Sequence, residues 1–521
     1  MNRAIEQLED RLTPVAPVNP SFESGLTGWT LTGAESPVGL GSTVTAVAGG
    51  TSGAQHSQLN VPNQDRAPVV GWTGLTQFLR SSNFTMVSGE QILVDWRVTR
   101  NPDDAIGLGE LRRTSDNALI STFFNVNSGS STSYTTASFT TIVVDTYYVQ
   151  FQGGTFDASL GGVAGAFLNV DNIRTVVPVP TIVYVDPSFT SAGANVDGDL
   201  TAGGNQAATV GFNAFSTIAA AMAAVASNGT VIVNTASYTE SPTLGTPLAE
   251  FRTYSATVNG NLTANAGIGG TGITFTGTGI TVTGTTLLSS AGNDVVLTAA
   301  NDFVGNVTVT AANASLHDVN TLNFAASTLT GNLTATASTI NVNGALATSG
   351  TGNISLTATQ NVAVSANVTG GTGGVTLLGQ GTAALNTHGV NITSRAVVSA
   401  AGVGAVSVTG TGGGGATAGA NMGVRVHGAG TKITSGGGNV SVSGTGGSGS
   451  SNTGVYGITN GLITSGGSGT VTVTGNGGPV GNGIGVLLDD SGKISSGGSG
   501  AVSVTGTAPA GARGVWVFVN S

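Results

Sequence analysis

Side chains that could cut a polysaccharide are scarce in the second half of the chain. Hydrolases of sugar chains use two or three carboxylates, and lyases use a base such as Lys or Arg together with Ca²⁺. After residue 250 the only adjacent acidic pair is Asp489 and Asp490. Neighbours on a strand point to opposite faces, and Ser491-Gly492 follow, so the pair predicts a turn rather than a catalytic dyad.

The remaining titratable residues form weaker patterns. Arg425 and His427 are two residues apart, so on a strand they would share a face and form a small polar patch. Asp197 and Asp199 lie in a Gly-rich loop and are a candidate cation site. Three histidines are isolated from one another and are predicted to lie at the surface: His317, His388 and His427.

Aromatic side chains are the candidates for sugar contact, because a sugar site needs exposed ring faces and a few polar groups. Four residues fit this requirement: Trp72, Tyr147, Tyr148 and Trp29. Trp96 lies on an apolar alternating face, so we predict that it belongs to a core.

Composition excludes several classes of protein. The chain has 521 residues, of which 8% are charged and 39% are hydrophobic, with a net charge of −10. Low charge with ample aliphatic residues excludes a charge-driven disordered chain. Thinly spread basic residues argue against nucleic-acid binding, which needs clustered Lys and Arg. There is no cysteine, hence no disulfide and no thiolate metal site. No apolar run is long enough to form a transmembrane helix.

Residues 17–178 predict an antiparallel β-sandwich. In 91–98, Ile92, Val94, Trp96 and Val98 share one face and alternate with Leu93, Asp95 and Arg97 on the other, as on a strand. Similar short runs are separated by clusters of Gly, Ser, Asn and Asp. The Val-Val-Pro-Val-Pro run at 176–180 predicts a stiff joint to a second architecture.

The two ends of this region resemble carbohydrate-binding modules with a galactose-binding-like jelly roll. The opening segment is Asn19-Pro20-Ser21-Phe22-Glu23 followed by Gly28-Trp29, and the closing segment is Val170-Asp171-Asn172-Ile173. The resemblance implies that the first and last strands pair, that Trp29 packs inside, and that Glu23 and Asp171 hold a structural Ca²⁺. The alternative is that both carboxylates only accept hydrogen bonds from turn amides.

Residues 179–250 predict the start of a solenoid. A strand at 182–185 precedes a helical pattern in which Phe215, Ile218, Met222 and Val225 share one face. Gly229 is predicted to end that helix with a positive φ. The order of strand, helix, "GTVIV" strand and "YTE" turn resembles the first segment of right-handed parallel β-helices of the pectin-lyase-like type, in which the helix covers the open first coil.

Residues 251–521 repeat. Val-x-Val-x-Gly recurs from Val406, Val440, Val471 and Val502, and two further short elements recur between these copies. Three short strands in each period of about 31 residues indicate a solenoid. The valines would stack inside, Ser and Thr would stack outside, and glycines would permit tight corners. About ten coils are expected.

Two further resemblances concern the context of the protein. The repeats between Leu316 and Leu356 are similar to haemagglutinin-type adhesin repeats. Leu8-Glu9-Asp10-Arg11-Leu12-Thr13-Pro14 resembles the N-terminal motif of large planctomycete surface and secreted proteins, which implies a sorting-type segment at 1–16. A disordered amphipathic tail is the alternative for that segment.

The sequence therefore predicts an all-β protein: a jelly-roll β-sandwich followed by a right-handed parallel β-helix with one short capping helix. We expect a non-enzymatic extracellular or cell-surface protein, adhesin- or stalk-like, whose first module contacts a polysaccharide or cell-envelope glycan. A pure spacer and a β-helix lyase or hydrolase with an attached binding module are the alternatives.

Overall fold

Strands form nearly all of the regular secondary structure of the described protein, as predicted. The structure is a computed structural model, and it describes residues 16–65, 72–86, 89–141, 145–158, 163–176, 179–265, 272–381, 388–414, 421–450 and 452–518. The motif at 8–14 lies outside these residues. The chain divides into two compact units, one of residues 1–179 and 192–194, the other of 180–191 and 195–521.

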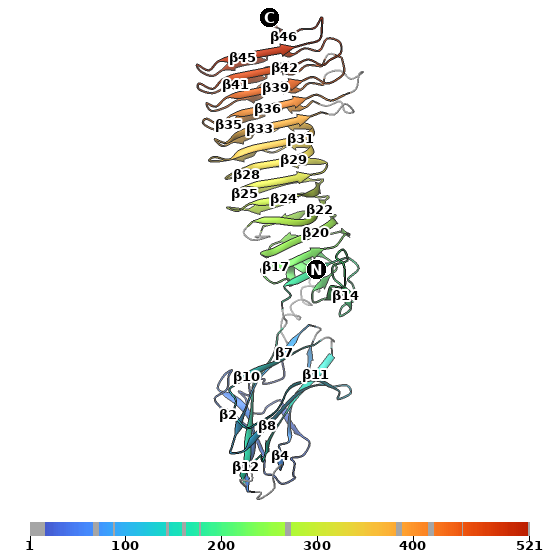
Figure 1. The fold of residues 1–521 in the computed structure, drawn as a ribbon, viewed down its shortest axis with the longest axis vertical. Coiled ribbons are helices and arrows are strands. Elements are labelled where there is room, and N and C mark those ends of the chain that lie inside the picture. Colours follow the sequence, from blue (N-terminus) through green and yellow to red (C-terminus); the bar gives the residue numbers. More distant parts are fainter. Residues whose placement is uncertain are drawn as a thin grey trace. The chain divides into compact units, whose positions relative to one another are not determined.

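The first unit is an antiparallel sandwich of two sheets (Figure 1). Its strands are β1 (Trp29–Thr32), β2 (Thr43–Ala48), β3 (Gln55–Asp65), β4 (Thr73–Leu75), β5 (Phe78–Ser81), β6 (Phe84–Met86), β7 (Gln91–Arg100), β8 (Asp104–Arg113), β9 (Leu119–Ser128), β10 (Thr135–Thr140), β11 (Asp145–Phe156) and β12 (Val163–Val176). One sheet has the order β1-β5-β11-β8-β9, with β4 and β6 also paired to β11. The other has the order β10-β7-β12-β3-β2.

Alternation along the strands produces the core between these sheets. On β7, Ile92, Val94 and Val98 are fully buried, and Trp96 stacks on Phe124 with ring centroids 4.2 Å apart. The prediction that Trp96 belongs to the core is thereby confirmed.

The predicted pairing of the first and last strands is wrong. The closing strand β12 pairs with β7 and β3. The opening segment 17–23 forms turns rather than a strand, and it touches β12 through the Ile173 amide, which donates to the Pro20 carbonyl at 3.0 Å. Phe22 has a positive φ of 58°, so this segment cannot continue as a flat strand.

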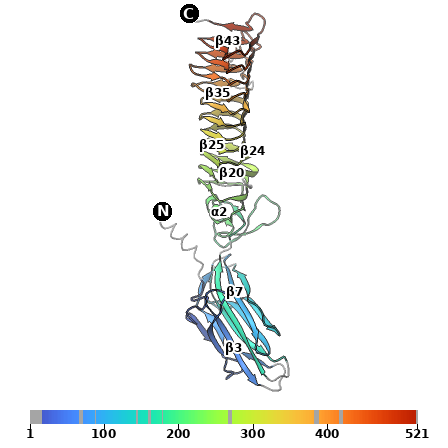
Figure 2. The ribbon, with the colours of Figure 1, turned by 90° about the vertical axis from the view of Figure 1, so that its left-hand side faces the viewer.

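The second unit begins with short elements around one helix. They are β13 (Ile182–Val185), β14 (Asn195–Asp197), β15 (Ala207–Thr209), β16 (Ala214–Phe215), α2 (Ile218–Ala224), β17 (Gly229–Val233), β18 (Ser237–Tyr238) and β19 (Thr243–Leu244). Figure 2 shows α2 at the first coil, where Ile218 and Met222 join the interior of the solenoid. The predicted capping helix is therefore present.

The reason given for the end of this helix is wrong in one respect. Asn228, rather than Gly229, adopts the positive φ, at 62°, because Asn tolerates the left-handed region better than most residues. Gly229 begins β17, and a Cβ there would lie 2.8 Å from the Thr181 carbonyl oxygen. Glycine is needed at 229 for close packing.

Stacked parallel strands form the rest of the unit (Figure 1). They are β20 (Leu248–Val258), β21 (Leu262–Ala264), β22 (Ile273–Val282), β23 (Thr286–Ser290), β24 (Val295–Phe303), β25 (Asn306–Ala311), β26 (Ala314–Asp318), β27 (Thr321–Phe324), β28 (Ser327–Leu329), β29 (Leu333–Val342), β30 (Leu346–Thr348), β31 (Asn353–Val364), β32 (Val368–Gly370), β33 (Gly374–Gln380), β34 (Val390–Ile392), β35 (Val397–Ala400), β36 (Val406–Thr411), β37 (Val424–His427), β38 (Lys432–Ile433), β39 (Val440–Thr445), β40 (Val455–Ile458), β41 (Leu462–Ser465), β42 (Val471–Asn476), β43 (Val486–Asp489), β44 (Lys493–Ser496), β45 (Val502–Thr507) and β46 (Val515–Val517).

The repeats predicted from the sequence are in register. Val406, Val440, Val471 and Val502 pair in succession along β36, β39, β42 and β45. The first three of these valines are at most 1% exposed, and the intervening Ser and Thr positions point outward. This confirms the predicted aliphatic interior and hydroxyl-lined exterior.

Glycines within these strands serve close packing, whereas others occupy turns as predicted, among them Gly402 and Gly467, which have positive φ. Gly410, Gly444 and Gly475 lie inside strands and carry no positive φ. A Cβ on any of them would lie 2.0 Å from a carbonyl oxygen of a second glycine column, which includes Gly454 and Gly485. Backbone therefore touches backbone across the interior at this point of each coil.

Candidate functional site

The four aromatic candidates from the sequence have different surroundings. Tyr147 and Trp29 belong to the sandwich core, with exposures of 2% and 7%. Trp29 packs on Phe22 at 4.8 Å, and its indole Nε1 donates to the Asn19 carbonyl at 3.1 Å. Neither ring offers a face to a sugar, so the prediction of sugar contact is corrected for both, and the competing core prediction for Trp29 holds.

Trp72 is half-buried at one end of the sandwich. Its ring lies against Gly74, where a Cβ would come within 2.8 Å of the Trp72 Cη2 atom, and the same Cβ would be 3.4 Å from Leu40. The Trp72 carbonyl accepts the Asp157 amide at 2.9 Å. Part of the Trp72 side chain stays accessible to solvent, and its role as a sugar contact remains a prediction.

Tyr148 lies on the opposite face of β11 from Tyr147, outside the core. It is 2% exposed because the Arg80 guanidinium covers its ring, with Cζ 3.6 Å from the ring centroid. Its hydroxyl donates to the Asn117 side chain. The Tyr148 ring is thus occupied by an arginine and does not itself stack on a ligand, which corrects the sequence expectation.

Around Tyr148, the outer side of the β1-β5-β11-β8-β9 sheet carries a connected set of polar groups. We call it the polar face, and it consists of Arg80, Glu110, Arg112, Tyr148 and Gln150. The Glu110 Oε2 atom accepts the Arg112 Nε at 2.8 Å and the Gln150 Nε2 at 2.7 Å. Glu110 and Gln150 are only 7% and 9% exposed although they face away from the core. Buried groups of this kind are held in fixed positions by their hydrogen bonds.

The hydrogen bond that Arg112 donates to Glu110 also stabilises the charged form of Arg112. It raises the pKa of Arg112 further above its usual value. Arg112 additionally donates from Nη1 to the Asn117 carbonyl at 2.9 Å. The charges of Glu110 and Arg112 therefore compensate each other within the pair.

Next to the polar face, the same side of the sheet carries three apolar residues, with Gln152 opposite one of them, Leu108. Leu75, Ile106 and Leu108 are half-buried and lie outside the core cluster. Gly154 pairs with both Leu75 and Ile106, and a Cβ on Gly154 would meet Leu75 Cδ2 at 2.6 Å. We call Leu75, Ile106 and Leu108 the apolar floor. An apolar surface with a few fixed polar groups is the usual composition of a small-molecule site.

Sequence reasoning missed the polar face, apart from Tyr148. The signal was present as alternation, since Glu110 and Arg112 lie two residues apart, as do Tyr148 and Gln150. The contacts between them join residues 40 positions apart. Which strands are neighbours decides these contacts, and a single sequence does not display strand order.

The two residues predicted to hold Ca²⁺ contact the same loop between β2 and β3. The Glu23 Oε1 atom accepts the Gln55 amide at 2.8 Å. The Asp171 Oδ2 atom accepts the Ser52 amide at 2.9 Å and the Thr51 hydroxyl at 2.9 Å. Asp171 is fully buried. The alternative stated from the sequence, hydrogen bonding to turn amides, describes these contacts.

A fit to Ca²⁺ depends on oxygen ligands beyond these two carboxylates. Ca²⁺ takes six to eight oxygens, including backbone carbonyls. In the part of the chain that the structure describes, no group of three His, Cys, Asp or Glu side chains is placed to hold a metal. Glu23 is exposed, so its carboxylate keeps room for a further ligand. The donor set fits Ca²⁺ only if loop carbonyls complete it, and the ion stays a prediction.

Asp95 adjoins this loop and was not anticipated from the sequence. It lies opposite Asp171 on β7, and both carboxylates accept the Thr51 hydroxyl. Burial acts to raise the pKa of Asp95, but hydrogen bonds from Thr136, Asn172 and Thr51 outweigh burial and leave the pKa below its usual value. Asp95 is therefore a charged, hydrogen-bonded part of the loop support.

In the second unit, the acidic candidates are occupied by local contacts. Asp197 and Asp199 accept loop amides, from Gln206 at 3.0 Å and from Ala202 at 3.0 Å respectively. Asp490 has a positive φ of 46°, and its amide donates to the Asp489 carboxylate at 2.8 Å, as in a turn. The turn predicted for this acidic pair is confirmed.

The histidines stay apart from one another. The His317 Nδ1 atom contacts the Thr336 hydroxyl at 2.9 Å, and the His388 Nδ1 atom accepts the Met422 amide at 3.2 Å. Arg425 and His427 share the outward side of β37, as predicted. Burial and the nearby Arg425 charge lower the pKa of His388 to about 4, so His388 is more enclosed than the predicted surface position.

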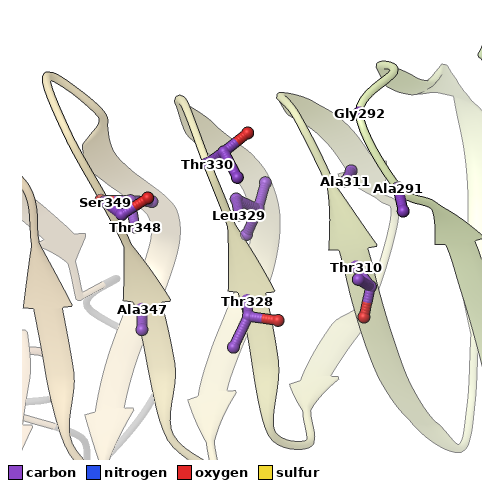
Figure 3. Close-up of a pocket in the computed structure, with 10 residues that line it drawn as sticks. All are labelled: Ala291, Gly292, Thr310, Ala311, Thr328, Leu329, Thr330, Ala347, Thr348 and Ser349. Carbon is purple, nitrogen blue, oxygen red and sulfur yellow. The ribbon is translucent and has the colours of Figure 1, made fainter.

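A shallow depression of about 300 Å³ lies on successive coils of the solenoid. Figure 3 shows Thr310, Thr328 and Ala347 in line on adjacent strands, with Leu329 and Thr330 beside them. Its lining carries hydroxyl and aliphatic groups and no titratable side chain. It cannot supply the acid and base that polysaccharide cleavage needs.

Known proteins resemble this chain in structure but not in sequence. No family model matches the chain, and no curated protein matches its sequence. A structure of TmCBM61 with beta-1,4-galactotriose is similar at 11% identity over 32% of this chain and 100% of that chain, with a TM-score of 0.22. A family 16 carbohydrate binding module-2 is similar at 18% identity over 31% and 99%, with a TM-score of 0.19.

Two of the similar structures extend over both units. One of them is the catalytic domain of a GH87 alpha-1,3-glucanase in complex with nigerose, at 10% identity over 89% of this chain and 92% of that chain, with a TM-score of 0.21. Likenesses at this level do not assign an activity to the chain. Within the described residues, no helix is both long and apolar enough to cross a membrane.

Proposed function

We propose that the first unit is a carbohydrate-binding module of a non-enzymatic extracellular or cell-surface protein, and that the solenoid serves it as a stalk. The observation that carries the proposal is the polar face beside the apolar floor. Glu110, Gln150 and Arg112 are fixed by mutual hydrogen bonds on a sheet face that the core does not use. Sugars combine apolar C–H faces with hydroxyls, and both have a counterpart here.

The solenoid supports the stalk role through its composition. The described coils satisfy their backbone by pairing with one another and present Ser and Thr outward. Such a unit holds its form without cysteine, which the chain lacks. The depression in Figure 3 lacks an acid or base. The titratable side chains that meet on the first coils bind one another: Arg252 pairs with Glu250 at 2.9 Å, and the Tyr254 hydroxyl donates to Asp199 at 3.3 Å.

Glycan binding by the full chain tests the proposal. The protein is screened against neutral and acidic plant and microbial polysaccharides, and hits are titrated calorimetrically. Gln150→Ala removes one member of the polar face, and we expect affinity to fall about tenfold, the equivalent of one net hydrogen bond in a desolvated site. Gln58→Ala, on the other sheet, is the matched control and should bind like the wild type.

Failure to bind any glycan would overturn the proposal. Equal losses in Gln150→Ala and Gln58→Ala would also count against it, because the polar face would then have no special part. Thermal unfolding of both variants establishes that each remains folded.

We further propose that Ca²⁺ stabilises the loop between β2 and β3 through Glu23 and Asp171, together with loop carbonyls. Bound Ca²⁺ would draw the two carboxylates and the loop together. We expect Ca²⁺ to raise the unfolding temperature of the first unit relative to EDTA, because a ligand that binds only the folded state stabilises it. Glu23→Gln should reduce that difference.

Glu35→Gln is the matched control for Ca²⁺. Glu35 also accepts loop hydrogen bonds, from the Ser42 amide at 3.0 Å and the Ser42 hydroxyl at 2.8 Å, but at a different loop. Glu35→Gln should leave the difference in unfolding temperature between Ca²⁺ and EDTA unchanged. If the wild type unfolded at the same temperature in Ca²⁺ and in EDTA, the proposal of a Ca²⁺ site would be wrong.

A further inference from the structure

The arginines of the β1-β5-β11-β8-β9 sheet differ in how their charges are balanced. Arg112 pairs with Glu110 at 2.8 Å, and Arg113 pairs with Asp116 at 3.2 Å and Asp145 at 3.3 Å. Arg80 forms no ion pair with any residue that the structure describes. The polar face therefore carries one uncompensated positive charge, in a protein with a net charge of −10.

Arg80 is also held in place. Its guanidinium stacks on the Tyr148 ring at 3.6 Å, and a buried tyrosine that already donates to Asn117 gives a rigid base. Among the described residues, the Arg80 guanidinium makes one hydrogen bond, and it is long: Nη2 donates to the Asn83 side chain at 3.5 Å. A guanidinium has five N–H donors, so most of those on Arg80 are available to a ligand.

The position of Arg80 places these donors beside the rest of the polar face. Arg80 on β5 is the register partner of Gln150 on β11, and Gln150 is in turn the partner of Glu110 on β8. Since Arg112 already neutralises Glu110, an anion at Arg80 would meet no unpaired carboxylate on the polar face.

We infer that the polar face selects a sugar that carries a carboxylate, with Arg80 as the residue that binds it. The inference rests on the proposed carbohydrate-binding function and specifies the class of glycan. A planar, stacked guanidinium matches a carboxylate through two parallel N–H···O bonds, and such charge-assisted bonds are about twice as strong as neutral ones. A neutral hydroxyl would leave the Arg80 charge unbalanced.

The test compares two ligands that differ in charge and otherwise only by the ester methyl groups, using the full chain. A galacturonic acid hexamer and its methyl ester are titrated calorimetrically against the wild type, Arg80→Gln, Arg80→Lys and Arg100→Gln. Arg100 is exposed on β7 of the other sheet, so Arg100→Gln removes the same charge from the same unit away from the polar face. Arg80→Lys keeps the charge and loses the bidentate geometry.

We expect the wild type to bind the acid at least tenfold more tightly than the ester, the scale of one charge-assisted pair. Arg80→Gln should abolish this preference while still binding the ester, Arg80→Lys should retain part of it, and Arg100→Gln should keep it whole. Near-UV circular dichroism reports whether Tyr148 keeps its packing in each variant.

Two results would overturn the inference and leave the proposed function standing: equal affinity of the wild type for acid and ester, or a preference that survives in Arg80→Gln. If a glycan that carries sulfate groups and no carboxylate bound as tightly as the galacturonic acid hexamer, the assignment to a carboxylate would be overturned. Absence of binding to the acid, the ester and every neutral glycan would instead overturn the proposed function itself.

Discussion

At the scale of single residues, position relative to the core decides what each aromatic or ionisable group can do. Tyr147 and Tyr148 are neighbours in sequence, yet one belongs to the core and the other supports Arg80. Glu240 shows the same dependence on position. Its carboxylate accepts the Ile218 and Ala219 amides at 2.7 and 3.0 Å and so satisfies the start of α2, which the sequence had indicated only as a turn.

His388 gives stability a dependence on pH. Its folded-state pKa of about 4 lies below the ordinary value near 6.5, so the unfolded chain binds the proton more readily. The stabilisation is complete above about pH 6.5 and is lost as the pH falls towards 4, on the order of 3 kcal/mol in total.

His388→Asn tests this dependence. Asparagine offers an oxygen to the Met422 amide and does not titrate, so the unfolding free energy should fall less steeply between pH 6.5 and 4 than in the wild type. Urea unfolding at a series of pH values measures how the unfolding free energy changes with pH, and His427→Asn is the control. An unchanged slope in His388→Asn would assign the acid sensitivity to other groups.

At the scale of elements, the sequence predicted the solenoid far better than the sandwich. Val406, Val440 and Val471 occur at nearly constant spacing, so their stacking follows from the repeat alone. The polar face depends on β5, β8 and β11 lying side by side, which no local pattern reveals. Similarly, the high glycine content indicated bends, whereas Gly444 and Gly475 serve backbone contact across the interior.

Gly475→Ala tests the close contact between the glycine columns. The new Cβ would lie 2.0 Å from the Gly485 carbonyl oxygen and 2.7 Å from Val486 Cγ2, so the coil must open or shift. We expect a loss of roughly 3 kcal/mol or more in unfolding free energy, within the range for severe overpacking. Chemical denaturation measures it. Thr474→Ala, whose side chain points outward, should cost less than about 0.5 kcal/mol; a similar small loss for Gly475→Ala would mean that the coils are less tightly closed.

At the scale of the whole molecule, the second unit is a stack in which each coil contacts its neighbours. Eleven strands follow one another on one side of it, from β20 through β22, β24, β26, β29, β31, β33, β36, β39 and β42 to β45, close to the ten coils expected from the sequence. Stability in such a stack is approximately a sum over coils and their interfaces.

Deleting one full period should therefore preserve the fold. Removal of 440–470 takes out 31 residues, the separation at which equivalent positions stack, and it joins Asn439 to Val471 in the original register. We expect a soluble, protease-resistant protein with a modest loss of stability. Removal of 440–455 breaks the register and should expose the coils to proteolysis, and equal protease resistance of the two deletions would contradict the stacked arrangement.

The direction of the bonds between coils has a mechanical consequence. These hydrogen bonds run along the stacking direction. A force applied along that direction would therefore break the bonds of one coil at a time, starting from the end of the stack. Each coil of 31 residues that peels away would release roughly 100 Å of slack in exchange for about 4.8 Å of height. A solenoid that unfolds coil by coil would lengthen in steps under load. Each step would limit the force that is transmitted to a domain joined to it.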